Sequence, residues 1–309
     1  MNPLVAIGVP VYNGEEYLAE CLESILRQTF SNWECVIVNN QSTDQSLSIA
    51  ESFARKDNRF RVITNPEFVD MITNFNNTYK YSNEAKYFKV VCVDDWIFPG
   101  HLTEMVNLLE KYPQAGLCSS YRLDHVTVNC AGLNYYDGPV FDGKEVLKQQ
   151  LLYKVDDLMG SETTLLIRTE TLKKLAGYPT IYPYGVYHFD TSQAYELLSI
   201  SDLAFVFQVT SYTRRSEQTY TSLYSNRFST HLNLREKELN KYKGMSEELE
   251  NEYKKERERY GYFLFKSRLK GDKECIEWHN KQMDSERKFT LREQLIYALK
   301  VNIKKLKRS

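Results

Sequence analysis

The chain has 309 residues, enough for one large α/β domain with an appendage or for two domains. Hydrophobic residues make up 42% and charged residues 26%, as in an ordinary globular protein, and the net charge of −1 gives no overall field favouring nucleic acid. No apolar run approaches the roughly 18 residues of a membrane span.

The N-terminal part of the chain alternates strand and helix signals. Short apolar runs typical of buried strands lie at 4–10, 33–40, 60–65 and 86–93. Apolar residues at helical spacing occupy 15–29, 42–56 and 71–82, and Ser42 or Thr43 is expected to cap the second of these helices. Strands alternating with helices imply parallel pairing and right-handed crossovers, hence an α/β fold with an open, mostly parallel sheet.

The pattern is looser after residue 115. It favours a strand at 115–128, a helix at 143–154, strand then helix over 162–178, a helix at 189–201 and a strand at 203–215. From about residue 229 the chain is helix-patterned and highly charged. We therefore expect one domain over 1–228, with halves 1–115 and 116–228, and a charged helical C-terminal region over 229–309.

The six cysteines show no metal-binding spacing, which favours free thiols and a reducing cytoplasm. Charge is unevenly distributed, because residues 233–309 hold 21 Lys and Arg against 14 Asp and Glu, whereas the whole chain has 40 against 41. This basic C-terminal region suggests an acidic surface as its neighbour.

Polar segments follow three of the predicted strands, as PVYNG, NNQSTD and VDDW. In open α/β sheets ligands bind beyond the carboxyl ends of the strands, so these segments are expected to converge on one crevice. Asp94 and Asp95 are adjacent carboxylates at such an end, where their repulsion would be offset by a cation or by several donors. The alternative is a helix cap for the HLTEMVNLLEKY segment that follows.

The blocks VAIGVPVYNGEEYLAECLESILRQTFSNWECVIVNNQSTDQSL and DDWIFPGHL together resemble the family 2 nucleotide-sugar glycosyltransferases, over about residues 4–220. The family's usual VDDGSTD is VNNQSTD here, and its usual Asp-x-Asp-Asp is CVDD at 92–95. The segment NFN at 74–76 resembles a variant branch with a similar Asn pair. The resemblance implies a GT-A fold, with helices on both faces of a Rossmann-like sheet, and inverting transfer of a sugar from a nucleoside diphosphate to an acceptor hydroxyl.

By this resemblance, Asp95 binds a divalent metal ion, Mn²⁺ or Mg²⁺, and Asp94 contacts the metal or the donor's ribose. These ions prefer oxygen ligands and are commonly held by one or two carboxylates plus substrate phosphates. Such an ion neutralises the charge that develops on the leaving diphosphate.

Pro10, Tyr12 and Asn40 match family positions that line the nucleoside pocket. Tyr12 would stack on the base; the alternative is an ordinary strand-end aromatic. Asn40 stands where the family has Asp, and an amide both donates and accepts, so it suits uracil or cytosine. The resemblance therefore implies a nucleotide-sugar donor of UDP type, with the base open.

Two further residues take roles by the same resemblance. Asp190 corresponds to the general base that activates the acceptor, the alternative being a plain N-cap of its helix. Arg214 would hold the diphosphate through paired donors, the alternative being a solvated strand-end charge. The acceptor is expected to be a saccharide or lipid-linked saccharide of cell-surface polysaccharide or glycolipid assembly. The tyrosine-rich segment 178–189 suits sugar rings, the alternative being ordinary packing within the protein.

The C-terminal segment 291–308 predicts a basic amphipathic helix, with leucines on one face and basic residues crowding its end. It favours peripheral binding to an anionic membrane surface; the alternative is a helix packed on the body with a solvated charged face.

The rival interpretation of the whole chain is a catalytically inactive GT-A-like module that binds nucleotide or a partner. It is supported by the departures from the family pattern at Asn39, Asn40, Cys92, Phe189 and Ser216. A nucleotidyltransferase is disfavoured because no Gly-rich loop follows the first strand.

Overall fold

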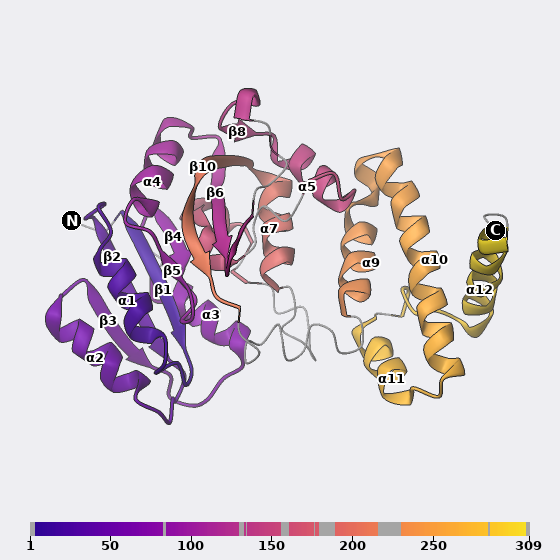
Figure 1. Cartoon of the computed structure of the whole chain (residues 1–309), viewed down its shortest axis with the longest axis horizontal. Coiled ribbons are helices and arrows are strands. Elements are labelled where there is room, and N and C mark those ends of the chain that lie inside the picture. Colours follow the sequence, from indigo (N-terminus) through magenta and orange to yellow (C-terminus); the bar gives the residue numbers. More distant parts are fainter. Residues whose placement is uncertain are drawn as a thin grey trace. The chain divides into compact units, whose positions relative to one another are not determined.

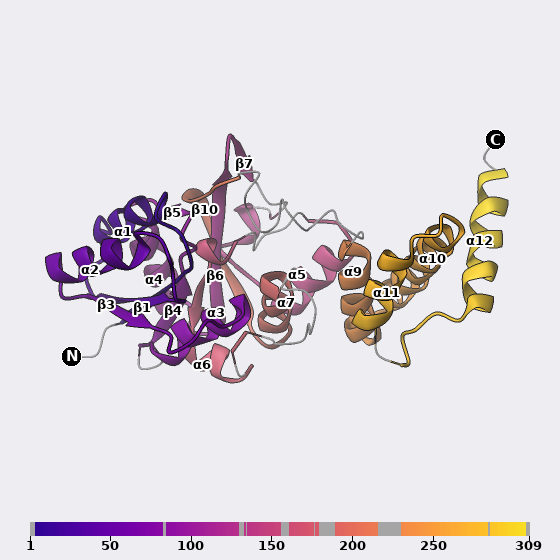
Figure 2. The same cartoon turned by 90° about the horizontal axis from the view of Figure 1, so that it is seen from below.

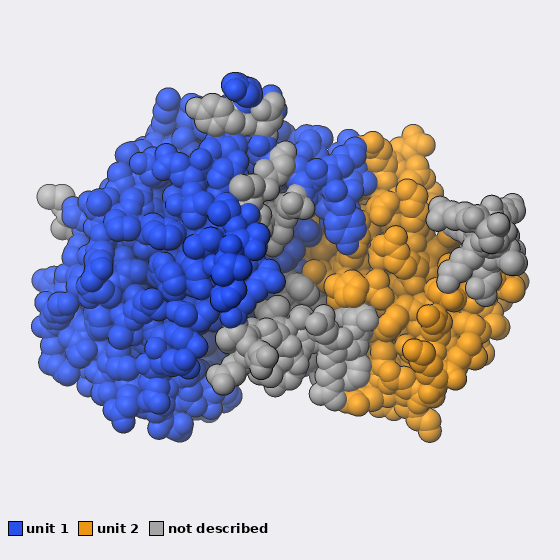
Figure 3. Space-filling model, in the orientation of Figure 1, with its two compact units in different colours: residues 1–180, 189–215 blue, residues 181–188, 216–309 orange. Residues whose placement is uncertain are grey.

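The computed structural model describes residues 4–82, 85–129, 133, 135–155, 161–175, 177–178, 189–215, 230–283 and 285–306. The chain divides into two compact units: unit 1 comprises residues 1–180 and 189–215, and unit 2 comprises residues 181–188 and 216–309 (Figure 3). The domain boundary expected at residue 229 falls outside the described residues, and the first described helix of unit 2 starts at Thr230.

Unit 1 combines strands and helices in alternation (Figure 1). Its strands are β1 Val5–Val11, β2 Trp33–Asn39, β3 Phe60–Thr64, β4 Tyr87–Val90, β5 Trp96–Ile97, β6 Ala115–Asp124, β7 Thr127–Asn129, β8 Val140–Phe141, β9 Leu166–Arg168 and β10 Asp202–Thr213. Its α-helices are α1 Leu18–Leu26, α2 Ser46–Lys56, α3 Met71–Lys80, α4 His101–Lys111, α5 Gly143–Leu151, α6 Thr169–Lys173 and α7 Phe189–Ile200. Short 3₁₀ turns are η1 Tyr135–Asp137 and η2 Glu162–Thr164.

The described strands form one sheet in the order β3-β2-β1-β4-β9-β6-β10-β5, with β7 beside β6 and β8 beside β10. β1, β2, β3 and β4 pair in parallel, β10 is parallel to β6, and β9 lies antiparallel between β4 and β6. The predicted open, mostly parallel α/β sheet is confirmed. Its carboxyl ends bring the segments after β1, β2, β3 and β4 to one edge.

Both faces of the sheet are covered by helices (Figures 1 and 2). Alternate residues of β1, from Val5 to Val11, are buried in one apolar cluster with α1 and α4. On the opposite face Gly8 lies against α3, where a Cβ atom would come within 2.5 Å of the Thr78 side chain. The absence of a side chain at Gly8 is therefore what allows α3 to pack directly on β1.

The predicted cap of α2 is wrong. The residue before the helix is Gln45, which makes no side-chain cap bond. Ser42 instead accepts from the backbone amide of Asn13, and the backbone amide of Thr43 donates to the Asn13 side chain at 2.8 Å. These side chains join the loops after β1 and β2 and are not free to cap the helix.

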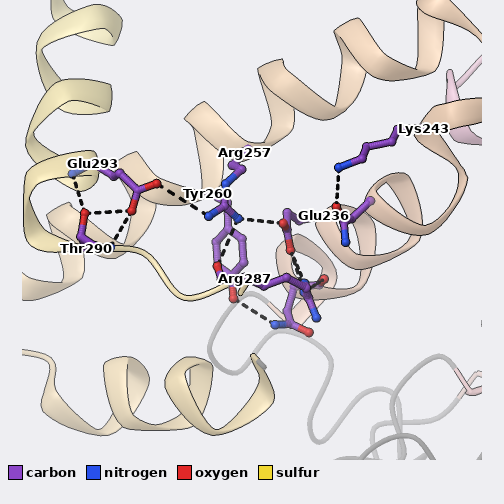
Figure 4. Close-up of polar contacts among 9 residues, drawn as sticks. Glu236, Lys243, Arg257, Tyr260, Arg287, Thr290 and Glu293 are labelled. Carbon is purple, nitrogen blue, oxygen red and sulfur yellow. Dashed lines mark hydrogen bonds and ion pairs between the residues drawn. The ribbon is translucent and has the colours of Figure 1, made fainter. Parts of the chain in front are cut away.

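Unit 2 is helical over its described residues, with α9 Thr230–Tyr242, α10 Glu247–Leu269, α11 Lys273–Gln282 and α12 Leu291–Leu306, and the 3₁₀ turn η4 Lys243–Met245 between α9 and α10. Its core contains a charge cluster (Figure 4). The fully buried Glu236 of α9 accepts from Arg257 of α10 at 3.0 Å and from Arg287 at 2.6 Å. Two arginines thus neutralise one buried carboxylate and connect three segments of the unit.

Among the described residues no helix has the length and apolar character that crossing a bilayer requires.

Candidate functional site

The two adjacent carboxylates, Asp94 and Asp95, lie in a tight turn between β4 and β5, at the edge where the parallel strands end. They do not cap the following helix: the residue before α4 is Gly100, and no side chain caps it. The helix-cap alternative is therefore excluded for both residues. Their position is the strand-end position expected for a ligand site.

Asp95 is buried and receives three hydrogen bonds from distant parts of the chain. Its Oδ2 accepts from the hydroxyls of Ser161 at 2.9 Å and Thr163 at 2.7 Å, and its Oδ1 accepts from the backbone amide of Arg214 at 3.0 Å. These bonds fix the turn against η2 and against the end of β10. Asp95 thus holds the two halves of unit 1 together at the site.

Asp94 differs from its neighbour in having an open carboxylate. No other residue among those described donates a hydrogen bond to its side chain, while its backbone carbonyl accepts from Nε of Arg214 at 3.1 Å. The same guanidinium pairs with Glu20 at 2.6 Å and lies over the ring of Tyr17, 4.3 Å from its centroid. Arg214 therefore lies at the acidic turn, while Arg215 is paired with Asp124.

Burial raises the pKa of both carboxyl groups, and the charge of Asp94 raises the pKa of Asp95 further. The three hydrogen bonds to Asp95 lower its pKa but do not outweigh burial, and the Arg214 guanidinium lowers the pKa of Asp94. A cation bound beside the pair would favour both ionised forms. The electrostatics of the turn therefore match a site for positive charge.

The protein side chains at this turn supply only part of the ligand set that a divalent cation needs. Among the described residues no group of three His, Cys, Asp or Glu side chains is placed to hold a metal. Mg²⁺ and Mn²⁺ are nevertheless commonly bound by one or two carboxylates with substrate phosphates completing the shell. The open oxygens of Asp94 supply donors of the right kind, and Asp95 is already engaged by protein donors.

Two buried ionisable groups beneath the site were missed by the sequence analysis. Lys89 of β4 is fully buried, donates to the carbonyl of Thr163 at 2.6 Å, and has its pKa lowered to about 7 by burial. Glu162 is buried and accepts from the Tyr178 hydroxyl at 2.7 Å, with its pKa raised to about 8 by burial. A lysine inside the apolar run YFKVVCV was the available signal for Lys89.

Asp190 lies in the first turn of α7 and accepts from the backbone amide of Thr191 at 2.7 Å. Its charge contributes to raising the pKa of Glu162 and of Tyr178, which places it near that buried pair. Phe189, which replaces a family Glu, forms an aromatic cluster with Phe75 and Tyr178, at centroid distances of 5.0 and 5.6 Å. Most of the tyrosine-rich segment 178–189 lies outside the described residues.

The predicted nucleoside residues lie at the ends of β1 and β2. Pro10 is buried within β1, opposite Val38 of β2. Tyr12 follows β1, is 49% exposed, and meets Phe68 edge-to-face at 4.9 Å between centroids. Asn40 is buried, and its amide is engaged by Val69 and Asn65.

The model of the family described as "Glycosyl transferase family 2" matches residues 6–156. An uncharacterized glycosyltransferase of Haemophilus influenzae is 32% identical over 141 residues, which are 45% of this chain and 43% of that protein. The glycosyltransferase GlyG of Streptococcus pneumoniae is 46% identical over 63 residues, 20% of this chain and 21% of that protein. The chain thus spans less than half the length of these relatives.

Solved structures resemble the fold at low sequence identity. Staphylococcus aureus TarS 1-349 in complex with UDP-GlcNAc has a TM-score of 0.58 and 19% identity, over 76% of this chain and 66% of TarS 1-349. The mannosyltransferase PcManGT from Pyrobaculum calidifontis, in complex with GDP-Man and Mn²⁺, has a TM-score of 0.57 and 14% identity, over 98% of this chain and 81% of that one. At these identities the likeness concerns the fold.

Proposed function

We propose that this chain, whose residues 6–156 match the model of glycosyl transferase family 2, transfers a sugar from a nucleoside-diphosphate donor to an acceptor hydroxyl. The observation that carries the proposal is the turn after β4, where the open carboxylate of Asp94 lies beside the firmly held Asp95 and the Arg214 guanidinium. One site thereby offers both carboxylate oxygens and a cation to a diphosphate.

We assign the binding of a divalent ion, Mn²⁺ or Mg²⁺, principally to Asp94, with Asp95 holding the turn in position. The Asp94 carboxylate would hold an ion that neutralises negative charge on the departing diphosphate. Arg214 would donate to phosphate oxygens from the same side, since its guanidinium already reaches the Asp94 carbonyl. Tyr12, half-exposed at the end of β1, would face the nucleoside.

Asp190 would accept the proton of the acceptor hydroxyl as it attacks with inversion. Its place at the start of α7 supports this role, because the partial positive charge of a helix N-terminus favours an ionised carboxylate. Because the pKa of the nearby Glu162 is raised to about 8, this carboxyl group is largely protonated near neutral pH and adds little negative charge beside Asp190.

We further propose that the enzyme binds peripherally to the cytoplasmic face of a membrane through α12, with a lipid-linked saccharide as acceptor. α12 packs on α10 through a face that includes the buried Gln294 and Ala298. Leu291, Leu295 and Leu299 point away from that packing and are 54%, 44% and 63% exposed.

The charge of this helical segment favours an anionic leaflet over an apolar protein partner. Residues 291–308 carry six basic side chains and one acidic side chain in the sequence. Each basic residue near an anionic leaflet contributes about 1 kcal/mol, and exposed leucines beside such charges insert into the headgroup region. The packed-helix alternative does not account for three exposed leucines on one face.

The decisive experiment is a donor screen with purified protein. UDP-, GDP- and other nucleoside-diphosphate sugars are incubated with and without Mn²⁺, and release of nucleoside diphosphate is followed without acceptor. A transferase is expected to hydrolyse its own donor slowly in the presence of Mn²⁺, and Asp94→Asn should abolish this release. Binding of a nucleotide without hydrolysis of any donor sugar would favour the inactive binding module.

A further inference from the structure

The side-chain amide of Asn40 is hydrogen-bonded to other groups of the protein. Its Nδ2 donates to the carbonyl of Val69 at 2.8 Å, and its Oδ1 accepts from the backbone amide of Val69 at 3.0 Å. The same oxygen accepts from Asn65 at 2.9 Å, and the side chain is 3% exposed. Both acceptor sites of Oδ1 and one of the two N–H groups of Nδ2 are occupied, so a nucleobase could not donate to this oxygen without displacing one of these bonds.

The segment bound by Asn40 is held from several directions. Asn65 donates to Asn40 and to Asn74, and it accepts from Asn77 at 2.9 Å, so four asparagine amides form one connected network. Gln41 also donates to the carbonyl of Asn65. Residues 65–69 are thereby fixed to the end of β2 and to α3.

This anchored segment carries an exposed aromatic ring. Phe68 is 59% exposed, although it lies next to the anchored Val69. Its ring meets that of Tyr12 edge-to-face, and the two rings come from segments that follow β3 and β1, the strands on either side of β2. Exposing two large rings costs hydrophobic free energy that stacking on a planar ligand would recover.

We propose that Phe68 is a base-stacking residue of the donor site and that Asn40 is a positioning residue that holds Phe68 beside Tyr12. This rests on the proposed function, since the ligand is the base of a nucleoside diphosphate. Sequence similarity alone would assign base recognition to the Asn40 amide. The geometry adds Phe68 to Tyr12 as a ring that can stack on the base, and it gives the Asn40 oxygen a protein partner instead of the base edge.

Calorimetric titration of the full chain with UDP, CDP and GDP in Mn²⁺, and with inorganic pyrophosphate, tests the proposal. Phe68→Ala should weaken the best nucleoside diphosphate about tenfold, as loss of one stacked base does, while pyrophosphate binds as before. Phe68→Trp should retain affinity. Tyr153→Ala, which removes another exposed ring of unit 1, is the control and should bind like the wild type.

A double-mutant cycle separates positioning from direct base contact. If Asn40 acts through Phe68, Asn40→Ala and Phe68→Ala each weaken binding and the double variant is little weaker than Phe68→Ala. Additive losses, or a change of base preference in Asn40→Ala, would return the base contact to Asn40 and overturn the proposal. Unchanged affinity of Phe68→Ala would overturn it as well, whereas failure of the wild type to bind any nucleoside diphosphate would remove the proposed function too.

Discussion

The backbone amide of Arg214 donates to the carboxylate of Asp95 at 3.0 Å, although 119 residues separate the two in the chain. The bond joins the end of β10 to the turn after β4. The other oxygen of Asp95 accepts from the Ser161 and Thr163 hydroxyls, so Asp95 connects three segments of the chain. The neighbouring Asp94 carboxylate accepts no hydrogen bond from another described residue.

This difference predicts opposite effects of two neighbouring substitutions. Asp94→Asn should leave the free energy of unfolding within about 0.5 kcal/mol of the wild type, because no other described residue donates a hydrogen bond to its side chain, yet abolish Mn²⁺-dependent nucleotide binding. Asp95→Ala should lose about 1–3 kcal/mol of stability, because two hydroxyls and one amide lose their acceptor. Urea unfolding and calorimetry measure the two effects, and equal destabilisation by both variants would contradict the assignment.

Asp190→Asn should reduce the rate of donor hydrolysis by about 10²–10⁴-fold while the dissociation constant for nucleoside diphosphate stays unchanged. The amide cannot take a proton from the water that attacks the donor in this assay, but it keeps the size of the side chain and an oxygen for the Thr191 amide. Single-turnover assays with the protein in saturating excess over the donor give the rate. Asp142→Asn, which alters the cap of α5, is the control. An equal reduction of the hydrolysis rate in Asp190→Asn and Asp142→Asn would indicate a structural effect and contradict the role of a base.

Glu162 predicts how stability depends on pH. Its pKa is raised from 4.5 to about 8 in the folded chain, so between these values the native state holds a proton that the unfolded chain has lost. The free energy of unfolding therefore falls as pH rises through this window. In Glu162→Gln this fall should shrink by about 3 kcal/mol between about pH 5 and 8. Denaturant unfolding across that range measures it.

The control for this titration is Glu170→Gln, which alters an exposed side chain of α6. Its profile should follow that of the wild type at every pH. If Glu162→Gln and the wild type also ran parallel, the fall in stability would have to come from other groups.

Replacing Leu291, Leu295 and Leu299 by Gln should lower co-sedimentation with anionic vesicles by roughly tenfold or more, because burying each leucine contributes about 1.5–3 kcal/mol. Vesicles of phosphatidylcholine with phosphatidylglycerol are compared with phosphatidylcholine alone, which should bind weakly. Ile200→Gln, an exposed apolar residue of α7, is the control. Equal sedimentation of variant and wild type would end the membrane proposal. A dimer abolished by the variant would assign the face to a second copy of the chain.

Glu236→Ala should destabilise unit 2 by about 3–5 kcal/mol, because Arg257 and Arg287 would both lose the buried carboxylate between them and Arg257 would keep only its longer contact with Glu293, at 3.9 Å. Lys300→Gln is the matched control, since it removes the partly exposed pair with Glu258 and should cost less than about 1 kcal/mol. Hydrogen exchange in α9 and α10 localises the effect. Similar protection in wild type and Glu236→Ala would contradict it.

The sequence predicted the sheet and the convergence of its strand ends because these depend on periodicity and on the geometry of parallel pairing. The position of Asp94 and Asp95 at a strand end followed from the same pattern, whereas a place for Arg214 at the donor site was implied only by the family resemblance. The donors to Asp95 could not be predicted, since Ser161 and Thr163 lie where the chain shows no clear period. The bonding of Asn40 to Val69 could not be predicted either, because an amide gives no sign of whether its partner is a ligand or the backbone.

The bonds on Asp95 also bear on the order of events during synthesis. β1, β2 and β3 can pair as soon as they leave the ribosome, because they are close neighbours in the chain. The turn after β4 must wait for residues 161, 163 and finally 214 before its carboxylate is satisfied. A nascent chain released before β10 would therefore contain the first strands but no assembled acidic turn, so the proposed donor site forms only after two thirds of the protein has been made.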